Sequence, residues 1–202
     1  DATKGIVLKY GSGYAATYYS ASNGGQTESI ANIWGSSGYP YLDVHDDPFD
    51  YNNPDSIVKK TTVYANGSGN NASLMALLKT KAIAALQSAG YSANTSNTTI
   101  QLIKSVTAHT PMYASPSRLY TKMDFSLSVT TANSSGSTVS ASATVTCDIF
   151  SELESMLSMS IQSGKNELWS VSKSSTAFTL QARRYGHGMG MSQRGAMYMG
   201  KL

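Results

Sequence analysis

Two neighbouring runs of alternating apolar and polar residues constrain the fold of this 202-residue chain more than any other feature of its sequence. The polar stretch Asn133-Ser134-Ser135-Gly136-Ser137 separates the two runs. Their apolar positions are Met123, Phe125, Leu127 and Val129 in the first run, and Val139, Ala141, Ala143, Val145, Cys147 and Ile149 in the second. Alternation with a period of two predicts strands that bury one face, so the runs predict a long antiparallel hairpin over 120–150.

A helix with one apolar stripe is predicted over residues 71–90. Its apolar side chains recur at spacings of three and four residues, and they are Leu74, Leu77, Leu78, Ala82, Ala85 and Leu86. Asn71 or Ser73 suits the start of this helix, and Gly90 suits its end. We expect the helix to pack on the apolar face of the hairpin around Phe125, so that the two elements form the core.

Shorter elements are predicted on both sides of this core. We expect a small hairpin from 5–10 and 14–20, a long ordered loop over 39–54, a strand from Ile100, a short helix from about Ser151 to Met159, and strands at 168–171 and 177–180. The predicted fold class is α+β, with a mostly antiparallel sheet and a few packed helices. The length suits one domain or two small ones, and we assign residues 1–202 to a single domain.

Charged residues are scarce in this chain. Asp, Glu, Lys and Arg make up 13% of the residues, against about 25% in typical soluble domains. Ser, Thr, Asn, Gly and 13 Tyr supply the polar surface instead, as in many exported proteins. The 15 Lys and Arg against 12 Asp and Glu give a net charge of +3, but these cations are scattered, so we expect no nucleic-acid partner. The chain begins without a signal-peptide pattern, and we expect it to be processed or trimmed.

Several classes of site are excluded by pattern. No stretch approaches the ~18 apolar residues of a membrane-spanning helix. Cys147 is the single cysteine, which excludes an internal disulfide and a cysteine-cluster metal site, and its place in the alternation predicts a buried thiol. The dinucleotide-binding pattern fails at Met191, and the hydrolase pattern G-x-S-x-G fails at Arg194. We therefore expect no cofactor and no metal.

The segment 185–196 is the strongest candidate for a functional loop. Alternate glycines remove side chains from it, so its backbone can approach a ligand closely. Ser192 occupies the position of a helix N-cap. His187, between two glycines, has little local packing. It is exposed in a cleft, or it is bonded to a nearby carbonyl in a tight turn, and the residues alone favour neither interpretation.

Gly186 to Gln193 resembles the GHGVGMSQ signature of the stage II sporulation protein D (SpoIID/LytB) family, although Arg194 replaces the aromatic residue that usually follows. The segment 18–28 resembles a second motif of that family, which ends in Gly-Gly-x-Thr-Glu. Further matches occur in the family's order at Trp34, Pro40-Tyr41-Leu42, Asp46-Asp47-Pro48-Phe49-Asp50, Glu152-Leu153 and Trp169-Ser170-Val171. The resemblance therefore spans almost the whole chain.

This resemblance implies an exported bacterial protein that acts on peptidoglycan in the cell wall, outside the cytoplasm or at the membrane. Members of the family are lytic transglycosylases, which cleave glycan strands to 1,6-anhydro products with one glutamic acid as acid and then base. Other members are described as amidase enhancers. The expected function is lytic transglycosylation with this chain forming most of the substrate groove, and the alternative is a non-catalytic peptidoglycan-binding or amidase-enhancing module.

The family's acid glutamate lies before the segment matched by Asp1 to Tyr10, and nothing in this chain matches that region. The family's usual C-terminal continuation is not matched either, so we expect a partial SpoIID-like domain that lacks both the N-terminal catalytic segment and the C-terminal end. Its partners would be peptidoglycan glycan strands and either a missing N-terminal segment of the same protein or a cell-wall amidase. The resemblance makes Glu28 and His187 the candidate catalytic residues. The candidate substrate-binding residues are Tyr19, Ser22, Asn23, Gly24, Gly25, Gln26, Thr27, Gly188, Ser192 and Gln193.

Structural alternatives exist for most of these residues. For Glu28 a structural role, with its carboxylate bonded to the Gly24-Gly25 loop or to a cation, is favoured over catalysis, and Ser22 and Asn23 either bond sugar groups or only cap a turn. Tyr19 and Trp34 can stack on sugar faces, but aromatic residues at strand ends are more often core. The loop aspartates Asp43, Asp46, Asp47 and Asp50 lack calcium-binding spacing and are predicted to be solvated, and His45 and His109 to be structural or surface residues.

Two further expectations concern packing. The loops 22–28 and 187–193 lie near opposite ends of the chain, and we expect them to converge on one cleft with exposed polar groups, as in loop-built sites. We expect the methionines of the C-terminal segment to pack the last helix against the core, and these are Met189, Met191, Met197 and Met199.

Overall fold

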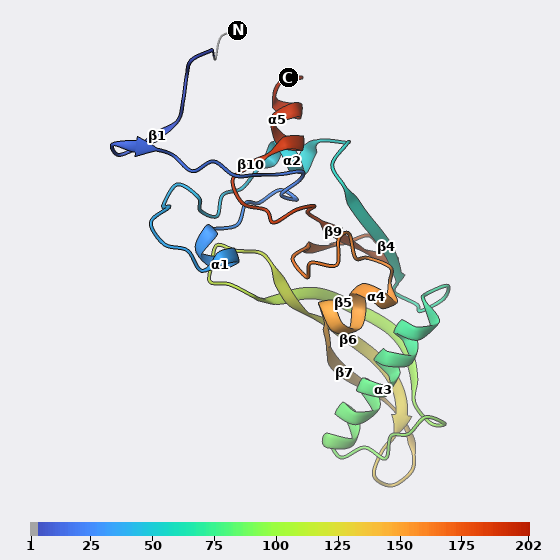
Figure 1. Ribbon diagram of the computed structural model, residues 1–202. Helices are drawn as coiled ribbons and strands as arrows, with labels where there is room; N and C mark the ends of the chain where they lie inside the picture. Colours follow the sequence, from blue (N-terminus) through green and yellow to red (C-terminus); the bar gives the residue numbers. More distant parts are fainter. Residues whose placement is uncertain (1–3) are drawn as a thin grey trace. The chain divides into compact units, whose positions relative to one another are not determined.

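The structure is a computed structural model that describes residues 4–202 (Figure 1). Contacts divide the chain into two compact units. The first unit combines the residues up to Ser56 with Gly186–Leu202, and the second comprises Ile57–Tyr185. Helices and mainly antiparallel strands build these units, which confirms the α+β fold class. Two compact units can belong to one domain, so the assignment of residues 1–202 to a single domain stays a prediction.

A three-stranded antiparallel sheet forms the centre of the second unit. β5 (Thr99–Pro111) pairs with β6 (Tyr120–Ala132), and β6 pairs with β7 (Thr138–Asp148). In the second pair Phe125 lies opposite Val145. The strand expected from Ile100 and the hairpin expected over 120–150 are confirmed. The prediction succeeds because a strand that buries one face has apolar residues at every second position.

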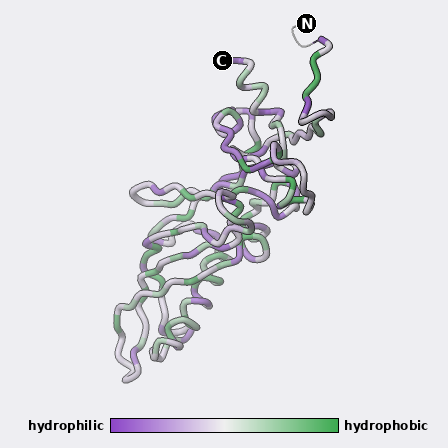
Figure 2. Tube along the Cα trace, turned by 90° about the vertical axis from the view of Figure 1, so that its left-hand side faces the viewer, coloured by the Kyte–Doolittle hydropathy of each residue, from purple (hydrophilic) through white to green (hydrophobic). Residues whose placement is uncertain are grey.

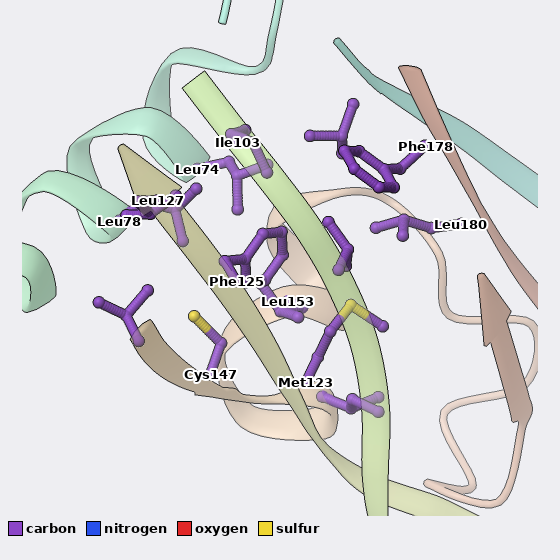
Figure 3. Close-up of a cluster of buried hydrophobic side chains, with 14 of the residues drawn as sticks. Leu74, Leu78, Ile103, Met123, Phe125, Leu127, Cys147, Leu153, Phe178 and Leu180 are labelled. Atoms are coloured by element: carbon purple, nitrogen blue, oxygen red, sulfur yellow. The ribbon is translucent and has the colours of Figure 1, made fainter. Parts of the chain in front are cut away.

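α3 (Ala72–Ser88) packs on the apolar face of this sheet and confirms the predicted helix. The Asn71 side chain accepts hydrogen bonds from the backbone N–H groups of Ser73 and Leu74 (2.9 and 3.1 Å), which caps the helix. The helix buries Leu74, Leu78, Ala82 and Leu86. Figure 3 shows side chains of the helix and of the sheet in one cluster around Phe125, so the two elements share a core.

Cys147 lies in the same cluster (Figure 3). The residue is fully buried, and burial raises the pKa of its thiol to about 11. A thiol with a raised pKa in apolar surroundings is inert, because the thiolate is the reactive form. The predicted structural role of this cysteine is confirmed.

A second antiparallel sheet in this unit has the order β4 (Val58–Tyr64), β9 (Ala177–Arg183), β8 (Leu168–Lys173). The strands predicted at 168–171 and 177–180 are confirmed as β8 and β9. β4 was not predicted from the sequence. It is an edge strand in which Val63 is the buried residue, so the hydrophobic pattern that would identify it is weak.

The helix predicted from about Ser151 to Met159 has the wrong bounds. A π-helical turn, η1 (Ile149–Leu153), follows β7 directly, and α4 (Glu154–Met156) continues it. The Asp148 side chain accepts a hydrogen bond from the Ser151 backbone N–H (2.7 Å) and so caps the turn two residues earlier than predicted.

The first unit consists of short elements. They are β1 (Lys9–Tyr10), β2 (Gly13–Tyr14), β3 (Tyr19–Ser20), α1 (Ile30–Trp34), α2 (Pro48–Asn52), β10 (Met191–Ser192) and α5 (Gln193–Met199). β1 and β2 form an antiparallel pair that is much shorter than the expected hairpin, whereas β3 and β10 pair in parallel. Ile30, Leu42 and Met189 form the buried apolar cluster of this unit.

Many apolar side chains of the first unit lie at its surface. Met191, Met197 and Met199 are each more than half exposed, so the prediction that the C-terminal methionines pack against a core is wrong for these three and holds for Met189 alone. Residues 6–8 are also exposed, and Figure 2 shows this apolar stretch in green next to the N-terminus. With so little apolar burial, hydrogen bonds must supply much of the order in this unit.

None of the helices within residues 4–202 combines the length and the hydropathy needed to cross a bilayer.

Two buried carboxyl groups organise the segment between α4 and β8. Glu167 accepts hydrogen bonds from the backbone N–H groups of Ile161 (3.0 Å), Gln162 (3.3 Å) and Asn166 (3.2 Å). Burial, followed by the negative charge of Glu167 and a hydrogen bond to it, raises the pKa of Glu154 to about 7. Glu154 therefore keeps its proton in the folded protein at pH values where an ordinary glutamate has lost it.

We expect the second unit to become less stable as the pH rises from about 5 to about 7. In this range the folded protein holds a proton on Glu154 that the unfolded chain has released, so the free energy of unfolding falls as the pH rises. Urea denaturation followed by circular dichroism at several pH values measures this slope. Glu154→Gln should flatten it.

The matched control is Glu152→Gln, which removes a half-buried carboxylate that pairs with Lys81 (2.9 Å) and accepts the Asp148 backbone N–H (2.7 Å), and which should keep the slope. A wild-type free energy of unfolding that stays constant or rises over this pH range would contradict the account.

Candidate functional site

The carboxylate of Asp50 is the centre of the loop 22–28. The Ser22 hydroxyl donates to it (2.9 Å to each oxygen), and the Gly24 backbone N–H donates to Oδ2 (2.9 Å). The Ser56 hydroxyl also donates to Oδ1. Asp50 is fully buried, so the expectation that it belongs to a solvated loop is wrong. A buried carboxylate is tolerated here because donors from both sides satisfy it.

The rest of the loop 22–28 is bonded to the segment 43–50 in the same way. The Asn23 side-chain amide donates to Asp47 Oδ2 (2.8 Å), and the Gln26 amide donates to Asp46 Oδ1 (3.1 Å). Thr27 Oγ1 donates to the Asp43 carbonyl (2.7 Å). The prediction that this loop exposes its polar groups is wrong for most of it, because Ser22, Asn23, Gly24, Gly25, Gln26 and Glu28 are all buried. The polar groups of these residues serve to hold the loop in place.

Gly25 and Gly190 are glycines for steric reasons. Gly25 has φ +101°, and a Cβ there would lie 2.9 Å from the ring of Tyr51. A Cβ on Gly190 would lie 2.1 Å from the Tyr18 carbonyl oxygen. Both motifs therefore need glycine where the chain passes close to a neighbouring segment.

The two predicted loops do converge. The Glu28 backbone N–H donates to the Gly188 carbonyl (2.9 Å), and the Met191 N–H donates to the Tyr18 carbonyl (3.0 Å). The Arg194 N–H reaches the Ala21 carbonyl (3.1 Å). Segments from the two ends of the chain thus lie side by side along the parallel pair β3–β10. The convergence is confirmed, and the roles assigned to the individual residues stay predictions.

Glu28 has a carboxylate held inside the unit. The residue is fully buried, and its Oε1 accepts hydrogen bonds from the Asn32 side-chain amide (2.7 Å) and the Ser29 backbone N–H (3.2 Å). A general acid must come within hydrogen-bond reach of the atom that it protonates. In this geometry Glu28 links the loop 22–28 to the start of α1, and a catalytic role requires the carboxylate to become accessible.

His187 is half-buried beside exposed aromatic rings. Its Nδ1 accepts a hydrogen bond from the Met189 backbone N–H (3.1 Å), so the neutral ring carries its proton on Nε2. The ring centroid lies 5.3 Å from that of Trp34, and Tyr18 packs edge-on against Trp34 at 5.0 Å.

The expectation that Tyr19 and Trp34 are core residues is wrong. Tyr19 is 61% exposed and Trp34 is 49% exposed. Exposed aromatic rings on an ordered support offer flat apolar faces to a ligand at a small cost in conformational entropy. These two residues are therefore accessible recognition groups.

Ser192 caps α5, as predicted, by accepting a hydrogen bond from the Gly195 backbone N–H (3.0 Å). It is almost fully buried, whereas the neighbouring Gln193 is exposed. Gly195 packs on Asp47, because a Cβ there would lie 2.6 Å from Asp47 Oδ2. The cap thus fixes the end of the segment 185–196, and the Gln193 side chain is exposed to solvent.

Two hollows flank Met191. One, of about 420 Å³, is lined by Leu8, Ala15, Ala16, Thr17, Tyr18, Tyr19, Thr27, Tyr41, Leu42, Asp43, His45, Gly190 and Met191. The other, of about 650 Å³, is lined by Thr27, Asp46, Asp47, Pro48, Phe49, Gly190, Met191, Ser192, Gly195, Ala196, Met199 and Gly200. They share Thr27, Gly190 and Met191, so they are two lobes of one surface. Aromatic and aliphatic walls with a few polar groups are typical of ligand sites.

Within residues 4–202, no group of three or more His, Cys, Asp or Glu side chains is placed to hold a metal ion.

The most important residues that the sequence analysis missed are Asp47 and Asp50. Asp47 caps α2 by accepting from the Asp50 backbone N–H (2.9 Å), and Pro48 occupies the first helical position. The Asp47-Pro48 pair is itself a helix-start signal. That signal identifies a helix where a loop was predicted, but it does not reveal that Asp50 is buried under the loop 22–28.

Comparison with known proteins gives one informative similarity. The chain is 27% identical to the amidase enhancer of Bacillus subtilis (strain 168) over 216 aligned residues, which cover 97% of this chain. The alignment covers 28% of that protein, so this chain spans less than a third of its length. No family model matches the chain.

We expect Asp50→Ala to loosen the loop 22–28, because the Ser22 hydroxyl and the Gly24 N–H lose their acceptor. One or two unsatisfied buried donors cost about 1–3 kcal/mol each, so amide hydrogen exchange in the loop should accelerate at least ~10-fold. Hydrogen–deuterium exchange with mass spectrometry measures this change. Asp55→Ala, an exposed aspartate on the same segment, is the matched control and should leave the loop protected. Equal protection in both variants would contradict the role of Asp50.

Proposed function

We propose that this chain is a bacterial cell-wall module that binds peptidoglycan glycan strands outside the cytoplasm and stimulates a cell-wall amidase. The similarity to an amidase enhancer over nearly the whole chain supports this reading. The resemblance of the two loop motifs to the SpoIID/LytB family supports the same context. The net charge of +3 also suits binding to an anionic wall.

The observation that carries the proposal is the exposed ring of Tyr19 on the wall of an ordered, two-lobed surface. Sugar rings have apolar C–H faces and a rim of hydroxyl and acetamido groups. Tyr19 lies on the wall of the smaller lobe beside Asp43 and His45, which supplies an aromatic face next to polar groups. Trp34 adds a second exposed ring beside His187. Such a site binds a glycan strand by stacking, and the polar groups orient it.

The predicted binding residues divide into two groups in this proposal. Tyr19, Thr27 and Gln193 contact the strand, because Tyr19 and Thr27 line the hollows and Gln193 is exposed. The buried residues hold the loops that carry them, and these are Ser22, Asn23, Gly24, Gly25, Gln26, Gly188 and Ser192. His187 orients the ring of Trp34.

Enhancement accounts for the geometry better than strand cleavage by this chain. Cleavage requires a carboxylic acid beside the glycosidic oxygen, and the candidate Glu28 is fully buried with Oε1 bonded to Asn32 and Ser29. An enhancer needs only to hold the strand and to present it to the amidase. The lytic transglycosylase function expected from the resemblance is thus the second candidate.

Trp34→Ala should weaken binding to purified peptidoglycan sacculi about 10-fold, which corresponds to about 1.4 kcal/mol of lost stacking. It should also lower the stimulation of a purified N-acetylmuramoyl amidase acting on those sacculi. Co-sedimentation measures the binding, and release of stem peptides measures the stimulation. Tyr64→Ala, which removes an exposed aromatic ring from β4 in the second unit, is the matched control and should change neither.

Mass spectrometry of the same digests separates the two candidate functions. The proposal requires that the chain alone releases no 1,6-anhydro products. If such products appear with the wild-type chain and vanish with Glu28→Gln, this chain cleaves strands and the enhancer proposal is wrong. Binding that is unchanged in Trp34→Ala would contradict the proposed site.

A further inference from the structure

The two units of the chain carry opposite net charges. Ile57–Tyr185 holds 11 Lys and Arg against 5 Asp and Glu, which gives the second unit a net charge of +6. The remaining residues hold 4 Lys and Arg against 7 Asp and Glu, a net charge of −3. The net charge of +3 for the whole chain therefore combines a basic unit with an acidic one. An excess of one sign on one unit indicates a partner of the opposite sign.

The acidic side chains of the second unit already have partners. Glu152 pairs with Lys81 (2.9 Å). Asp148 pairs with Lys122 (2.9 Å). The other three are engaged by a histidine, by backbone N–H groups or by one another, and they are Asp124, Glu167 and Glu154. Most lysines of this unit are therefore not neutralised by a carboxylate.

Lys104 and Lys173 are two such lysines, and neutral oxygens hold both in place. Lys104 Nζ donates to Ser142 Oγ (2.8 Å), and Lys173 Nζ donates to the Lys104 carbonyl oxygen (3.4 Å). Lys173 Nζ also lies over the ring of Phe178, 5.5 Å from its centroid. Among the residues that the structure describes, neither lysine forms a salt bridge. An ammonium group has three donors, so both lysines keep charge and donors for an anion.

The Lys104 ammonium group lies on the polar face of the three-stranded sheet, whose other face is covered by α3. Residues directly opposite one another in an antiparallel pair share a face, so Ser105, Ser126 and Thr144 form one row across the three strands. Ser128 and Ser142 belong to the next row. Ser105, Ser142 and Thr144 are exposed. This face therefore offers hydroxyl groups next to lysines that no carboxylate neutralises.

We propose that the second unit binds a linear phosphodiester polyanion along this hydroxyl-lined face, with Lys104 and Lys173 paired to its phosphates. Hydroxyl and ammonium donors together are the side-chain groups that contact phosphate oxygens in complexes of proteins with phosphodiester chains. The spacing of the two ammonium groups favours a polymer. Lys173 Nζ lies at β5 and Lys104 Nζ at β7, two strand spacings or roughly 10 Å away. A chain with phosphates along its length can contact both, whereas one phosphate cannot.

The composition of this face favours a wall polymer over a nucleic acid. Single-stranded nucleic acids stack their bases on aromatic rings, but the outward positions of Ser126–Thr130 and Ser140–Thr146 carry hydroxyl groups. Leu102 is an exposed apolar exception on β5. Asp124 accepts a hydrogen bond from Thr146 Oγ1 (2.6 Å) and makes that end of the face acidic, so the polymer binds at the other end. The location in the wall rests on the proposed function, whereas the phosphate chemistry does not.

The test is the binding of a fluorescently labelled poly(glycerol phosphate) to the 202-residue chain, measured by anisotropy at several salt concentrations. The wild-type chain should bind saturably, with an affinity that falls as salt rises. Lys104→Gln and Lys173→Gln should each weaken binding several-fold. Each should also lower the slope of log K against log salt by about 0.7, the value for one phosphate contact on a single strand. Ser142→Asp places a carboxylate beside the Lys104 ammonium and should act like Lys104→Gln.

Lys79→Gln is the matched control, because Lys79 belongs to α3 and likewise donates to a neutral oxygen, the Thr95 carbonyl (2.7 Å). It removes the same charge from the same unit and should leave the affinity nearly unchanged, since exposed charges beyond about 8 Å are screened at physiological salt. Trp34→Ala should also keep polymer binding, which separates this face from the proposed glycan site. Circular dichroism confirms that each variant is folded.

Three results overturn the proposal. The first is a wild-type chain that does not bind the polymer. The second is a loss of affinity in Lys79→Gln or Trp34→Ala as large as in Lys104→Gln, because net charge or the other site then accounts for the binding. The third is displacement of the labelled polymer by a single-stranded oligonucleotide, or by phosphatidylglycerol vesicles, at a lower phosphate concentration than by unlabelled polymer.

Discussion

The buried carboxylate of Asp50 is the constraint on which the first unit depends. A charge without solvent is costly unless donors surround it, and here they come from Ser22, from the Gly24 backbone and from Ser56. These donors belong to segments before and after the aspartate. Satisfying one carboxylate therefore fixes the loop 22–28 and the exit from α2 at the same time.

Neighbouring contacts extend this order to the C-terminal segment. Asp47, which caps the same helix, holds Asn23 and packs on Gly195 of α5. The Gly188 carbonyl accepts a hydrogen bond from the Glu28 backbone N–H, which joins the loop 187–193 to the loop 22–28. Because the polar residues of both motifs are used in this way, the recognition groups left at the surface are mainly aromatic. In the proposed function Tyr19 and Trp34 therefore contact the ligand, and most of the motif residues hold the loops in place.

The sequence allows prediction of those parts of the fold that have a clear period. The hairpin around Phe125 and the helix that begins after Asn71 both bury one face, so their patterns report the structure directly. β4 has one strongly buried residue and gives no such pattern. The η1 turn starts early because Asp148 caps it, and a cap shifts a boundary without changing the hydrophobic period.

The candidate site was predictable in part for a different reason. The convergence of its two loops was expected because both are glycine-rich segments with polar groups and little reason to lie in a core, as in loop-built sites. The burial of those loops does not follow from any local pattern, since Ser22 and Asn23 find their acceptors more than twenty residues away. The exposure of Trp34 likewise depends on packing around the short helix α1. Tertiary partners, which a single sequence does not reveal, decide which polar residues face solvent.

Tryptophan fluorescence tests the central claim most directly, namely that the aromatic surface around Trp34 binds peptidoglycan glycan strands. The chain has two tryptophans, of which Trp34 is half exposed and Trp169 is buried in the second unit. Titration with soluble glycan fragments should shift the emission to shorter wavelength in a saturable way, and Trp34→Phe should abolish the shift. Fragments that bind the chain without changing the emission, or with a change that survives in Trp34→Phe, would contradict the account.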